Sequence, residues 1–494
     1  MDRALNVMFV VSEAVPFAKT GGLADVAGSL PLALSKAGLR VSVLMPLYGM
    51  IRQGGSDLTK AITDLEIPFD FFTLKGDVYS AVRDGVTFYF VERDEFFDRR
   101  QLYGTPKGDY FDNLERFVFF AKSFLPLCQA LELKPDIIHC HDWQSALVPV
   151  YVREKWQDEA EVNQAATVFT IHNLAYQGLF AKEKYHLLDL DISLFGIDGL
   201  EFYDRINFLK GGILWSDVVT TVSQQYSREI QTPEFGCGLE GVLQTRAEVL
   251  TGIVNGVDYT VWNPATDNLI AAPYTPTSLA GKANNKKALM EEYQLDPTLQ
   301  EAPLLGIVSR LADQKGFDLL AAILPELLAD NVTLVILGTG EEKYHKLLSQ
   351  AAAEYKGKIG VTIAFDNRIA HLIEAGADMF LMPSYYEPCG LNQIYSLKYG
   401  TIPVVRATGG LVDTIEPVDI KKKTGTGFLF QEYSPEAFLA CIREACQAYQ
   451  NKTLWKKIMA NAMNRDFSWE SSAKAYESLY RQALARKAAE RSSA

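Results

Sequence analysis

The run KTGGLADV at residues 19–26 offers the clearest chemistry in this chain. It lies between an apolar run, Val7–Val11, that is typical of a buried strand and an apolar-periodic segment, Val26–Ala37, that is typical of a helix. A glycine turn in that place brings bare backbone N–H groups and the positive end of the helix dipole close to a ligand. Lys19 adds a cation, and Asp25 adds a carboxylate in the first helical turn. The pattern predicts a site for an anionic, hydroxyl-rich ligand such as a sugar joined to a diphosphate, although an ordinary strand-to-helix turn also explains it.

The run SRLADQKG at residues 309–316 is a second candidate for phosphate binding. It follows a predicted strand, Leu304–Val308, and places Arg310 and Lys315 on the two sides of a short loop. Ligands of α/β proteins bind at the carboxyl ends of parallel strands, so both cations can reach one diphosphate from adjacent sides. A surface loop with two solvated cations is the alternative interpretation.

The run PSYYEPCGLNQ at residues 383–393 follows another predicted strand, Met379–Met382, and enters a predicted helix. The backbone N–H groups of residues 389–391 are expected at the helix start, where they can bind hydroxyl or phosphate oxygens. Glu387 is expected to be exposed at the strand end, where its carboxylate would accept hydrogen bonds from sugar hydroxyls. A glutamate in a proline-bounded turn is the structural alternative.

Two histidines, His139 and His141, lie two residues apart at the end of a predicted strand, Ile137–Cys140, so their side chains share one face. This arrangement suggests a metal, but no third ligand lies nearby and the spacing is not that of a zinc site. Asp142 and Trp143 fit better as a carboxylate and an apolar wall of a ligand cleft.

His172 and Asn173 close a further predicted strand, Thr167–Ile171. A histidine there either faces the cleft or is a satisfied interior polar group. The sequence contains no Walker A, HExxH or GxSxG pattern, and its only Asp-x-Asp run, Asp189–Asp191, is away from any predicted strand end. We therefore expect no metal and no cofactor, with the charge of a leaving diphosphate neutralised by lysine, arginine and helix N-termini.

The elements that must position these residues form two series of apolar runs separated by amphipathic segments. The predicted strands of the first series are Val7–Val11, Val41–Met45, Ile137–Cys140, Thr167–Ile171 and Val218–Val222. Those of the second are Leu304–Val308, Thr333–Leu337, Val361–Phe365, Met379–Met382 and Ile402–Val405. Continuous apolar strands alternating with helices indicate parallel sheets covered on both faces. The predicted fold class is α/β, with two doubly wound, Rossmann-like domains facing a deep cleft. Residues 50–110 are expected to form hairpins and loops inserted in the first domain.

The domain boundaries follow from a turn-rich junction at residues 252–258 and a helical tail. The first predicted domain is residues 1–250 together with a C-terminal helix, 468–494, and the second is residues 251–467. A chain of 494 residues is too long for a single core. Its net charge of −13 argues against binding to nucleic acid or to an anionic membrane. No apolar run is long enough to span a bilayer, no signal peptide is evident, and the six cysteines are scattered, so a cytoplasmic location is expected.

Together these residues resemble the bacterial glycogen synthases and plant starch synthases, retaining glucosyltransferases with the two-domain GT-B fold. The resemblance covers nearly the whole chain. It rests on motifs in the family's order at residues 19–26, 141–143, 172–173, 309–316, 387–391, and 408–411 with 413–414. One such motif would carry little weight, whereas six in order are specific.

The resemblance implies transfer of glucose from ADP-glucose to the non-reducing 4-hydroxyl of an α-1,4-glucan, glycogen or a maltooligosaccharide, with retention. The first domain would bind the acceptor and the second the nucleotide sugar. The implied catalytic residues are Glu387, His172, Asp142, Lys315 and Arg310. The implied substrate-binding residues are Lys19, Gly21, Gly22, Asp25, Tyr103, Asn173, Cys389, Gly390, Leu391 and Asn392. Position 392 is often threonine in this family, so its phosphate contact is an open point.

Two other classes of function stay open. A non-hydrolysing sugar-nucleotide epimerase shares the two-domain architecture but needs no glucan acceptor, and the motif at residues 387–391 argues against it. A non-catalytic glucan-binding protein of the same fold would show erosion at the charged positions, and none is evident. Oligomeric state and regulation are not encoded in any recognisable motif.

Overall fold

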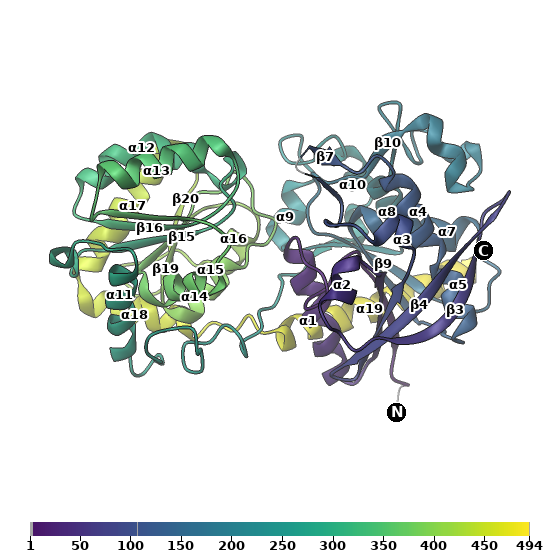
Figure 1. The fold of residues 1–494 in the computed structure, drawn as a ribbon, viewed down its shortest axis with the longest axis horizontal. Coiled ribbons are helices and arrows are strands. Elements are labelled where there is room, and N and C mark those ends of the chain that lie inside the picture. The colour runs from purple at the N-terminus through teal and green to yellow at the C-terminus, as the bar shows by residue number, and fades with distance from the viewer. Residues whose placement is uncertain (1–2, 106, 494) are drawn as a thin grey trace. The chain divides into compact units, whose positions relative to one another are not determined.

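The computed structural model describes residues 3–105 and 107–493. The chain forms two compact units (Figure 1): unit 1 consists of Met1–Gly256 with Trp469–Ala494, and unit 2 of Val257–Ser468. Each unit is a sheet with helices on both faces, so the predicted α/β class with two doubly wound domains is confirmed. No helix among the described residues is both long and apolar enough to cross a membrane.

Unit 1 is built on a nine-stranded sheet in the order β14-β13-β9-β8-β1-β2-β5-β4-β3. The strands are β1 (Asn6–Val10), β2 (Arg40–Pro46), β3 (Thr59–Pro68), β4 (Thr73–Arg83), β5 (Val86–Val91), β8 (Ile137–His141), β9 (Ala166–Ile171), β13 (Val218–Thr221) and β14 (Leu250–Gly252). All pairings are parallel except those of the β3–β4–β5 meander. The prediction of inserted hairpins and loops for residues 50–110 is wrong in one respect. β5 pairs in parallel with β2 and extends the main sheet, because its alternate residues from Val86 to Phe90 are buried in the core.

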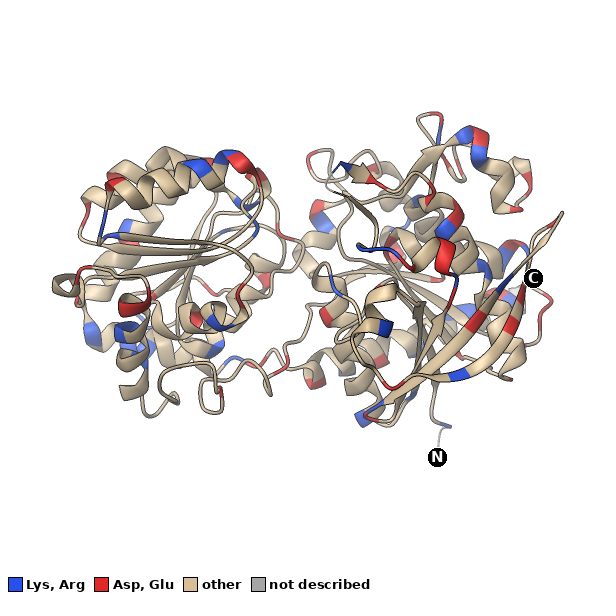
Figure 2. Ribbon diagram, in the orientation of Figure 1, with Lys and Arg blue, Asp and Glu red and all other residues tan. Residues whose placement is uncertain are grey.

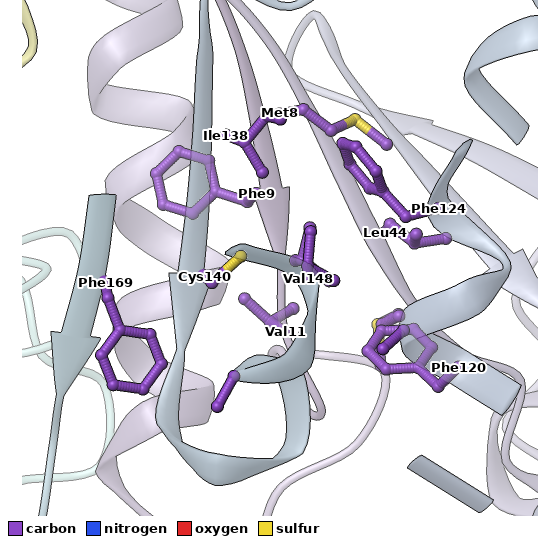
Figure 3. Close-up of a cluster of buried hydrophobic side chains, with 14 of the residues drawn as sticks. Met8, Phe9, Val11, Leu44, Phe120, Phe124, Ile138, Cys140, Val148 and Phe169 are labelled. Carbon is purple, nitrogen blue, oxygen red and sulfur yellow. The ribbon is translucent and has the colours of Figure 1, made fainter. Parts of the chain in front are cut away.

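The helices of unit 1 cover both faces of this sheet. They are α1 (Gly22–Lys36), α2 (Gly49–Gln53), α3 (Asp94–Phe97), α4 (Asn113–Lys122), α5 (Phe124–Ala130), α6 (Asp142–Ser145), α7 (Leu147–Glu154), α8 (Phe208–Trp215), α9 (Gln224–Glu229), α10 (Glu240–Thr245) and α19 (Trp469–Ser493). A small sheet of β10 (Leu179–Ala181), β12 (Arg205–Asn207) and β11 (Glu201–Phe202) and a short pair, β6 (Gly104–Thr105) with β7 (Gly108–Asp109), complete the unit. Figure 3 shows the core where side chains of β1 and β8 meet those of α4, α5 and α7.

The C-terminal helix α19 belongs to unit 1, where it packs against α1 and β9. Tyr480 of this helix is buried, and its hydroxyl lies 2.8 Å from Nδ1 of His139. The other ring nitrogen of His139 lies 2.7 Å from the hydroxyl of Thr170. His139 is therefore a satisfied interior residue that ties the tail of the chain to the centre of the sheet.

Unit 2 has a six-stranded, wholly parallel sheet in the order β17-β16-β15-β18-β19-β20. The strands are β15 (Leu304–Val308), β16 (Thr333–Gly338), β17 (Ile359–Ile363), β18 (Met379–Met382), β19 (Ile402–Arg406) and β20 (Phe428–Phe430). The covering helices are α11 (Ala280–Glu292), α12 (Phe317–Ala329), α13 (Glu342–Glu354), α14 (Asn367–Gly376), α15 (Asn392–Tyr399), α16 (Gly409–Thr414), α17 (Pro435–Gln450) and α18 (Lys452–Met463). With β15 as the first strand this is the 3-2-1-4-5-6 order of a dinucleotide-binding fold.

Several element boundaries differ from the prediction by one residue, and those of two elements differ by more. β17 begins at Ile359 and ends at Ile363, so each end lies two residues before the predicted one. Phe365, predicted as the last strand residue, lies beyond the strand and is 88% exposed. The first helix begins at Gly22 and not at Val26, so the glycine turn and the helix start coincide. The backbone N–H groups of the glycines are therefore those of the helix N-terminus itself.

Candidate functional site

The predicted residues of unit 1 lie after two neighbouring strands, β1 and β8. These strands pair in parallel, and the chain runs from β1 towards β2 on one side and from β8 towards β9 on the other. A crevice opens at such a switch point beyond the carboxyl ends of the strands, and ligands bind there in α/β sheets. We call the residues that follow β1, β8 and β9 at this edge the unit-1 site.

The turn before α1 leaves space in which a ligand could approach its backbone closely. Lys19 forms an ion pair with Asp25 in the first turn of the helix, with 2.7 Å between Nζ and Oδ1. Gly21 is the N-cap, has extended backbone and receives no side-chain cap. A Cβ added at Gly22 would meet no atom within 4 Å. The packing of the chain does not require a glycine at residue 22, so the open space is available to a ligand.

A carboxylate and two histidines follow β8 and β9. Asp142 has a left-handed backbone, with φ of 55°, and its Oδ1 accepts a hydrogen bond of 2.7 Å from the backbone N–H of His172. Nδ1 of His141 lies 3.0 Å from Nε2 of His172, and the ring of His141 stacks on Phe9. The structure thus brings together three predicted residues, Asp142, His172 and the adjoining Asn173, at one strand edge.

Burial favours the uncharged forms of these groups. It lowers the pKa of His172 to about 3, and burial with the neighbouring histidines lowers the pKa of His141 well below its ordinary value. Burial raises the pKa of Asp142 to about 7, against the hydrogen bonds from the backbone of His172 and Asn173. A nearby carboxyl group, Glu13, raises it further. The histidines of the unit-1 site are therefore polar but neutral groups, which suit a sugar better than an anion.

An apolar wall and a tyrosine border this site. Trp143 is buried, and Gly178, with φ of 64°, packs against its ring so closely that a Cβ would lie 2.6 Å from Cε3. Tyr103 is half-buried, and its hydroxyl lies 2.7 Å from that of Ser12. Ser12 is the second residue after the end of β1. Tyr103 is therefore held against unit 1 by a buried partner.

The predicted residues of unit 2 lie after β15 and β18, which are neighbours at the switch point of the second sheet. The loop after β15 ends at Gly316, whose φ is 76° and whose Cβ would lie 2.1 Å from the carbonyl oxygen of Pro383. The backbone N–H of Tyr385 donates to the carbonyl of Gln314 at 2.9 Å. These contacts join the two predicted loops, residues 309–316 and 383–393, into what we call the unit-2 site.

The centre of the unit-2 site is an ion pair between Lys315 and Glu387, with 2.6 Å between Nζ and Oε2. The hydroxyl of Ser384 donates to the same carboxylate oxygen at 3.0 Å. The prediction that Glu387 is exposed is wrong: only 5% of the residue is accessible, because Lys315 and Ser384 enclose its carboxylate. Arg310 is exposed and donates to Oε1 of Gln314 at 3.0 Å, so its guanidinium keeps other donors for a ligand.

Residues 389–391 form the turn that leads into α15, with Gly390 at φ of 72° and Leu391 at the N-cap. A second glycine pair supports this turn from α16. The N–H of Gly410 donates to the carbonyl of Glu387 at 3.0 Å, and a Cβ at Gly409 would lie 2.0 Å from that oxygen. The side chain of Asn392 donates to the carbonyl of Val308 at 2.5 Å, so it anchors the helix start to the end of β15. The amide nitrogen of this side chain is thus engaged within unit 2.

Sequence reasoning missed three residues near these sites. Glu13 bonds to Thr20 of the first motif and Ser384 bonds to Glu387. Glu13 precedes the first motif in the sequence, and Ser384 lies inside the run at residues 383–393. Phe365 lies just past β17 at the same edge of the sheet as residues 309–316 and was assigned to the strand. Its exposed ring is a flat apolar surface of the kind on which a base stacks.

The charges of the two units are mixed, so that lysine and arginine lie among aspartate and glutamate on each unit in Figure 2. The candidate phosphate-binding cations are therefore local features of an acidic protein. Within residues 3–105 and 107–493, no group of three or more histidine, cysteine, aspartate or glutamate residues has the arrangement of a metal site. The cysteines in this part of the chain are free thiols.

Family models and relatives that match nearly the full length of the chain agree with one another. The family described as starch synthase catalytic domain matches residues 6–245, and that described as glycosyl transferases group 1 matches residues 291–462. A glycogen synthase of Koribacter versatilis is 49% identical over 480 residues, which cover 97% of this chain and 98% of that protein. A glycogen synthase of Geotalea uraniireducens is 47% identical over 483 residues, which cover 98% of this chain and 100% of that protein.

The solved structures agree with this. The catalytic domain of Starch Synthase IV from Arabidopsis thaliana, bound to ADP and acarbose, has a TM-score of 0.89 and 32% identity and covers 98% of this chain and 100% of its own. A sucrose-phosphate synthase from Thermosynechococcus elongatus, with a TM-score of 0.60 and 17% identity, covers 97% of this chain and 99% of its own and shares the fold.

Proposed function

This chain belongs to the glycogen and starch synthase family of GT-B glucosyltransferases, and we propose that it uses ADP-glucose to lengthen an α-1,4-glucan with retention of configuration. Glucosyl transfer in glycan synthesis is the activity of the family. The donor, the acceptor bond and the stereochemistry are the proposed parts. The single observation that carries them is the Lys315–Glu387 pair at the switch point of unit 2, which sets a cation and a sugar-orienting carboxylate side by side.

Unit 2 is proposed to bind the nucleotide sugar. Lys315 and Arg310 would neutralise the charge that develops on the departing diphosphate, the largest electrostatic demand of this reaction. Glu387 would orient the glucose hydroxyls, while the turn at residues 389–391 presents the N–H groups of a helix start. The related Arabidopsis enzyme is described with bound ADP, which supports an adenine nucleotide as donor here.

Unit 1 is proposed to bind the acceptor and to supply the Lys19–Gly22 turn to the diphosphate. The neutral His172 and the amide of Asn173 suit the hydroxyls of a glucan, and Trp143 supplies an apolar wall. The acarbose in the Arabidopsis enzyme supports a glucan-like ligand. Asp142 holds the backbone at His172, so its role is to fix the orientation of that histidine.

The proposed chemistry is a front-face substitution. The bond between the anomeric carbon and the diphosphate oxygen breaks, the acceptor 4-hydroxyl oxygen forms the new bond on the same face, and its proton passes to the departing ADP. A carboxylate nucleophile, as in retaining glycosidases, would instead need a carboxylate free to attack. Glu387 is engaged by Lys315 and Ser384, which favours an orienting role. Lysine, arginine and helix N-termini carry the charge, so we propose no metal and no cofactor.

The test is product release from ADP-glucose and from UDP-glucose, each with and without glycogen, in the presence of EDTA. Glycogen-dependent turnover of ADP-glucose that persists in EDTA and lengthens an α-1,4 chain supports the proposal. Preference for UDP-glucose overturns the donor. Release of a free epimerised sugar, or no turnover with either donor, favours an epimerase or a non-catalytic glucan-binding protein.

A further inference from the structure

We propose that Glu13 is a positioning residue of unit 1, whose carboxyl group holds the Lys19–Gly22 turn in the shape that receives the donor diphosphate. The inference rests on the proposed function for the identity of the ligand. The structural basis of the inference does not depend on the proposed function, because the contacts of Glu13 lie within unit 1. Glu13 is not among the residues that the motifs point to by their chemistry.

The contacts of Glu13 all lead to this turn. Its Oε2 accepts hydrogen bonds from both the backbone N–H and the hydroxyl of Thr20, the latter at 2.8 Å. Its other oxygen, Oε1, lies 3.8 Å from the position that a Cβ would occupy at Gly21. Glu13 therefore reaches the N-terminus of α1 from the side, where the N-cap residue has no side chain of its own to offer.

The loop that carries Glu13 is itself fixed at several points. The N–H of Val15 donates to the carbonyl of Ala24 at 3.0 Å, and the guanidinium of Arg83 donates to the carbonyl of Val15 at 3.1 Å. Glu13 is 97% buried, and the preceding Ser12 is fully buried. Because Glu13 is buried and its loop is fixed, its hydrogen bonds hold Thr20 at a defined place, which a solvated side chain would not do.

The carboxyl group is also in a place where its charge matters. A negative charge beside the N-terminus of α1 would compete with a diphosphate for the same N–H groups and dipole end. Burial raises the pKa of Glu13 to about 7, although its hydrogen bonds from Thr20 and Gly21 lower it. The titratable groups that face Glu13 are Asp25 of α1, Asp142 after β8, Tyr48 before α2 and Tyr103 before β6. Lys19 is paired with Asp25 and completes the set of charges at the turn.

The ionisation of Glu13 should make the KM for the donor depend on pH. Below pH 7 the carboxyl group is neutral and still accepts from Thr20, so the turn is held without a competing charge. Above pH 7 it ionises and repels the diphosphate, so the KM for the donor rises. Donor binding in turn favours the protonated form of Glu13. A glutamine at this position keeps an acceptor oxygen but cannot ionise.

The experiment compares E13A and E13Q with the wild type and with Glu66→Gln, a control on β3 whose side chain is 68% exposed. We expect E13A to raise the donor KM about tenfold, the effect of losing a buried acceptor, while its kcat changes less. We expect E13Q to restore the donor KM and to flatten its rise between pH 6 and pH 8.5. Amide hydrogen exchange in peptides spanning residues 14–30 should be faster in E13A and unchanged in E13Q.

The outcomes separate the two proposals. An active wild type with the same donor KM and exchange in E13A overturns the positioning role. An E13Q variant whose donor KM rises with pH as in the wild type overturns the part played by its ionisation. A wild type that does not turn over ADP-glucose overturns the proposed function, while the exchange measurement still decides whether Glu13 holds the turn. If E13A is unfolded in a thermal melt, the comparison of E13Q with the wild type across pH decides alone.

Discussion

The two glycine pairs of this protein look alike in sequence but differ in what surrounds them. In unit 2, a Cβ at Gly409 would lie 2.0 Å from the carbonyl oxygen of Glu387, and one at Gly410 would lie 2.1 Å from that of Cys389. In unit 1, a Cβ at Gly21 would make only an ordinary contact, and one at Gly22 would meet nothing. The pair in unit 2 is required by the packing of the chain, whereas the pair in unit 1 leaves space that the chain does not use. The contrast indicates that the protein itself fills the space beside the turn in unit 2, whereas the space beside the turn in unit 1 is available to a ligand.

The charged groups of the two sites differ in a related way. Unit 2 holds an ion pair, Lys315 with Glu387. Unit 1 holds His172 in its neutral form at neutral pH and raises the pKa of Asp142 to about 7. The carboxylate of the unit-2 site is therefore paired with a lysine, whereas the groups after β8 and β9 of unit 1 have no such cation bonded to them.

The largest expected effect comes from breaking the Lys315–Glu387 pair. Lys315→Ala should lower kcat by roughly 10²–10³, the scale for losing one preorganised group that stabilises developing charge, and Arg310→Ala should behave alike. Steady-state kinetics with ADP-glucose and glycogen measures this. Lys287→Ala is the control, since its side chain is 66% exposed on α11. A loss below tenfold in either alanine variant would remove that residue from the diphosphate role.

The next prediction tests the glycine comparison directly. Gly410→Ala should lower the free energy of unfolding by about 3 kcal/mol or more, because its Cβ overlaps a carbonyl oxygen that cannot move freely. Gly22→Ala should leave that free energy within about 1 kcal/mol of the wild type and raise the donor KM about tenfold. Urea unfolding and donor kinetics measure the two effects.

A matched control exists within unit 1. Gly241 lies in α10, and a Cβ there would meet nothing within 4 Å, as at Gly22. Gly241→Ala should therefore match Gly22→Ala in stability while leaving the donor KM unchanged. A Gly22→Ala variant with wild-type donor kinetics would show that the open space at this turn is not a ligand position.

A pH-dependent effect on stability should follow from the buried carboxyl group of Asp142. Its pKa is raised to about 7 in the folded state, so its contribution to stability is present below the unfolded pKa near 4 and is lost as the pH rises to 7. Asp142→Asn keeps an oxygen for the N–H of His172 but removes the ionisation. The wild type should therefore lose stability relative to this variant by roughly 1.4 kcal/mol per pH unit between pH 4 and pH 7.

Urea unfolding of both proteins from pH 5 to pH 8 measures that difference. His172 has the opposite sign, because its pKa is lowered to about 3 and its contribution is lost as the pH falls below 6.5. Its effect is common to both proteins and cancels in the difference. A difference that does not change with pH would contradict the raised pKa of Asp142.

The fold was more accessible from sequence than the contacts within the sites. Continuous apolar runs such as Leu304–Val308 and Met379–Met382 identified strands at their observed bounds, because buried parallel strands leave a strong pattern. The prediction of an exposed Glu387 is wrong because Lys315 comes from a different loop that only the folded sheet brings to it, and because Ser384 of its own turn folds back on the carboxylate. The sequence did not predict the parallel pairing of β5 with β2, because a hairpin strand and a strand that extends the main sheet share one alternating pattern.

The smallest expected effect concerns Tyr103, which sharpens the comparison from the side of unit 1. Tyr103→Phe removes the hydroxyl that lies 2.7 Å from Ser12 and should cost about 1 kcal/mol of stability, with a change in KM below about fivefold. In a double-mutant cycle with Ser12→Ala, the second substitution should add little, because both remove the same hydrogen bond. Additive costs would mean that each hydroxyl has another partner. Since Ser12 directly precedes Glu13, a KM effect in Ser12→Ala larger than in Tyr103→Phe would point to the loop after β1, and not to the tyrosine ring, as the element that sets the geometry of this site.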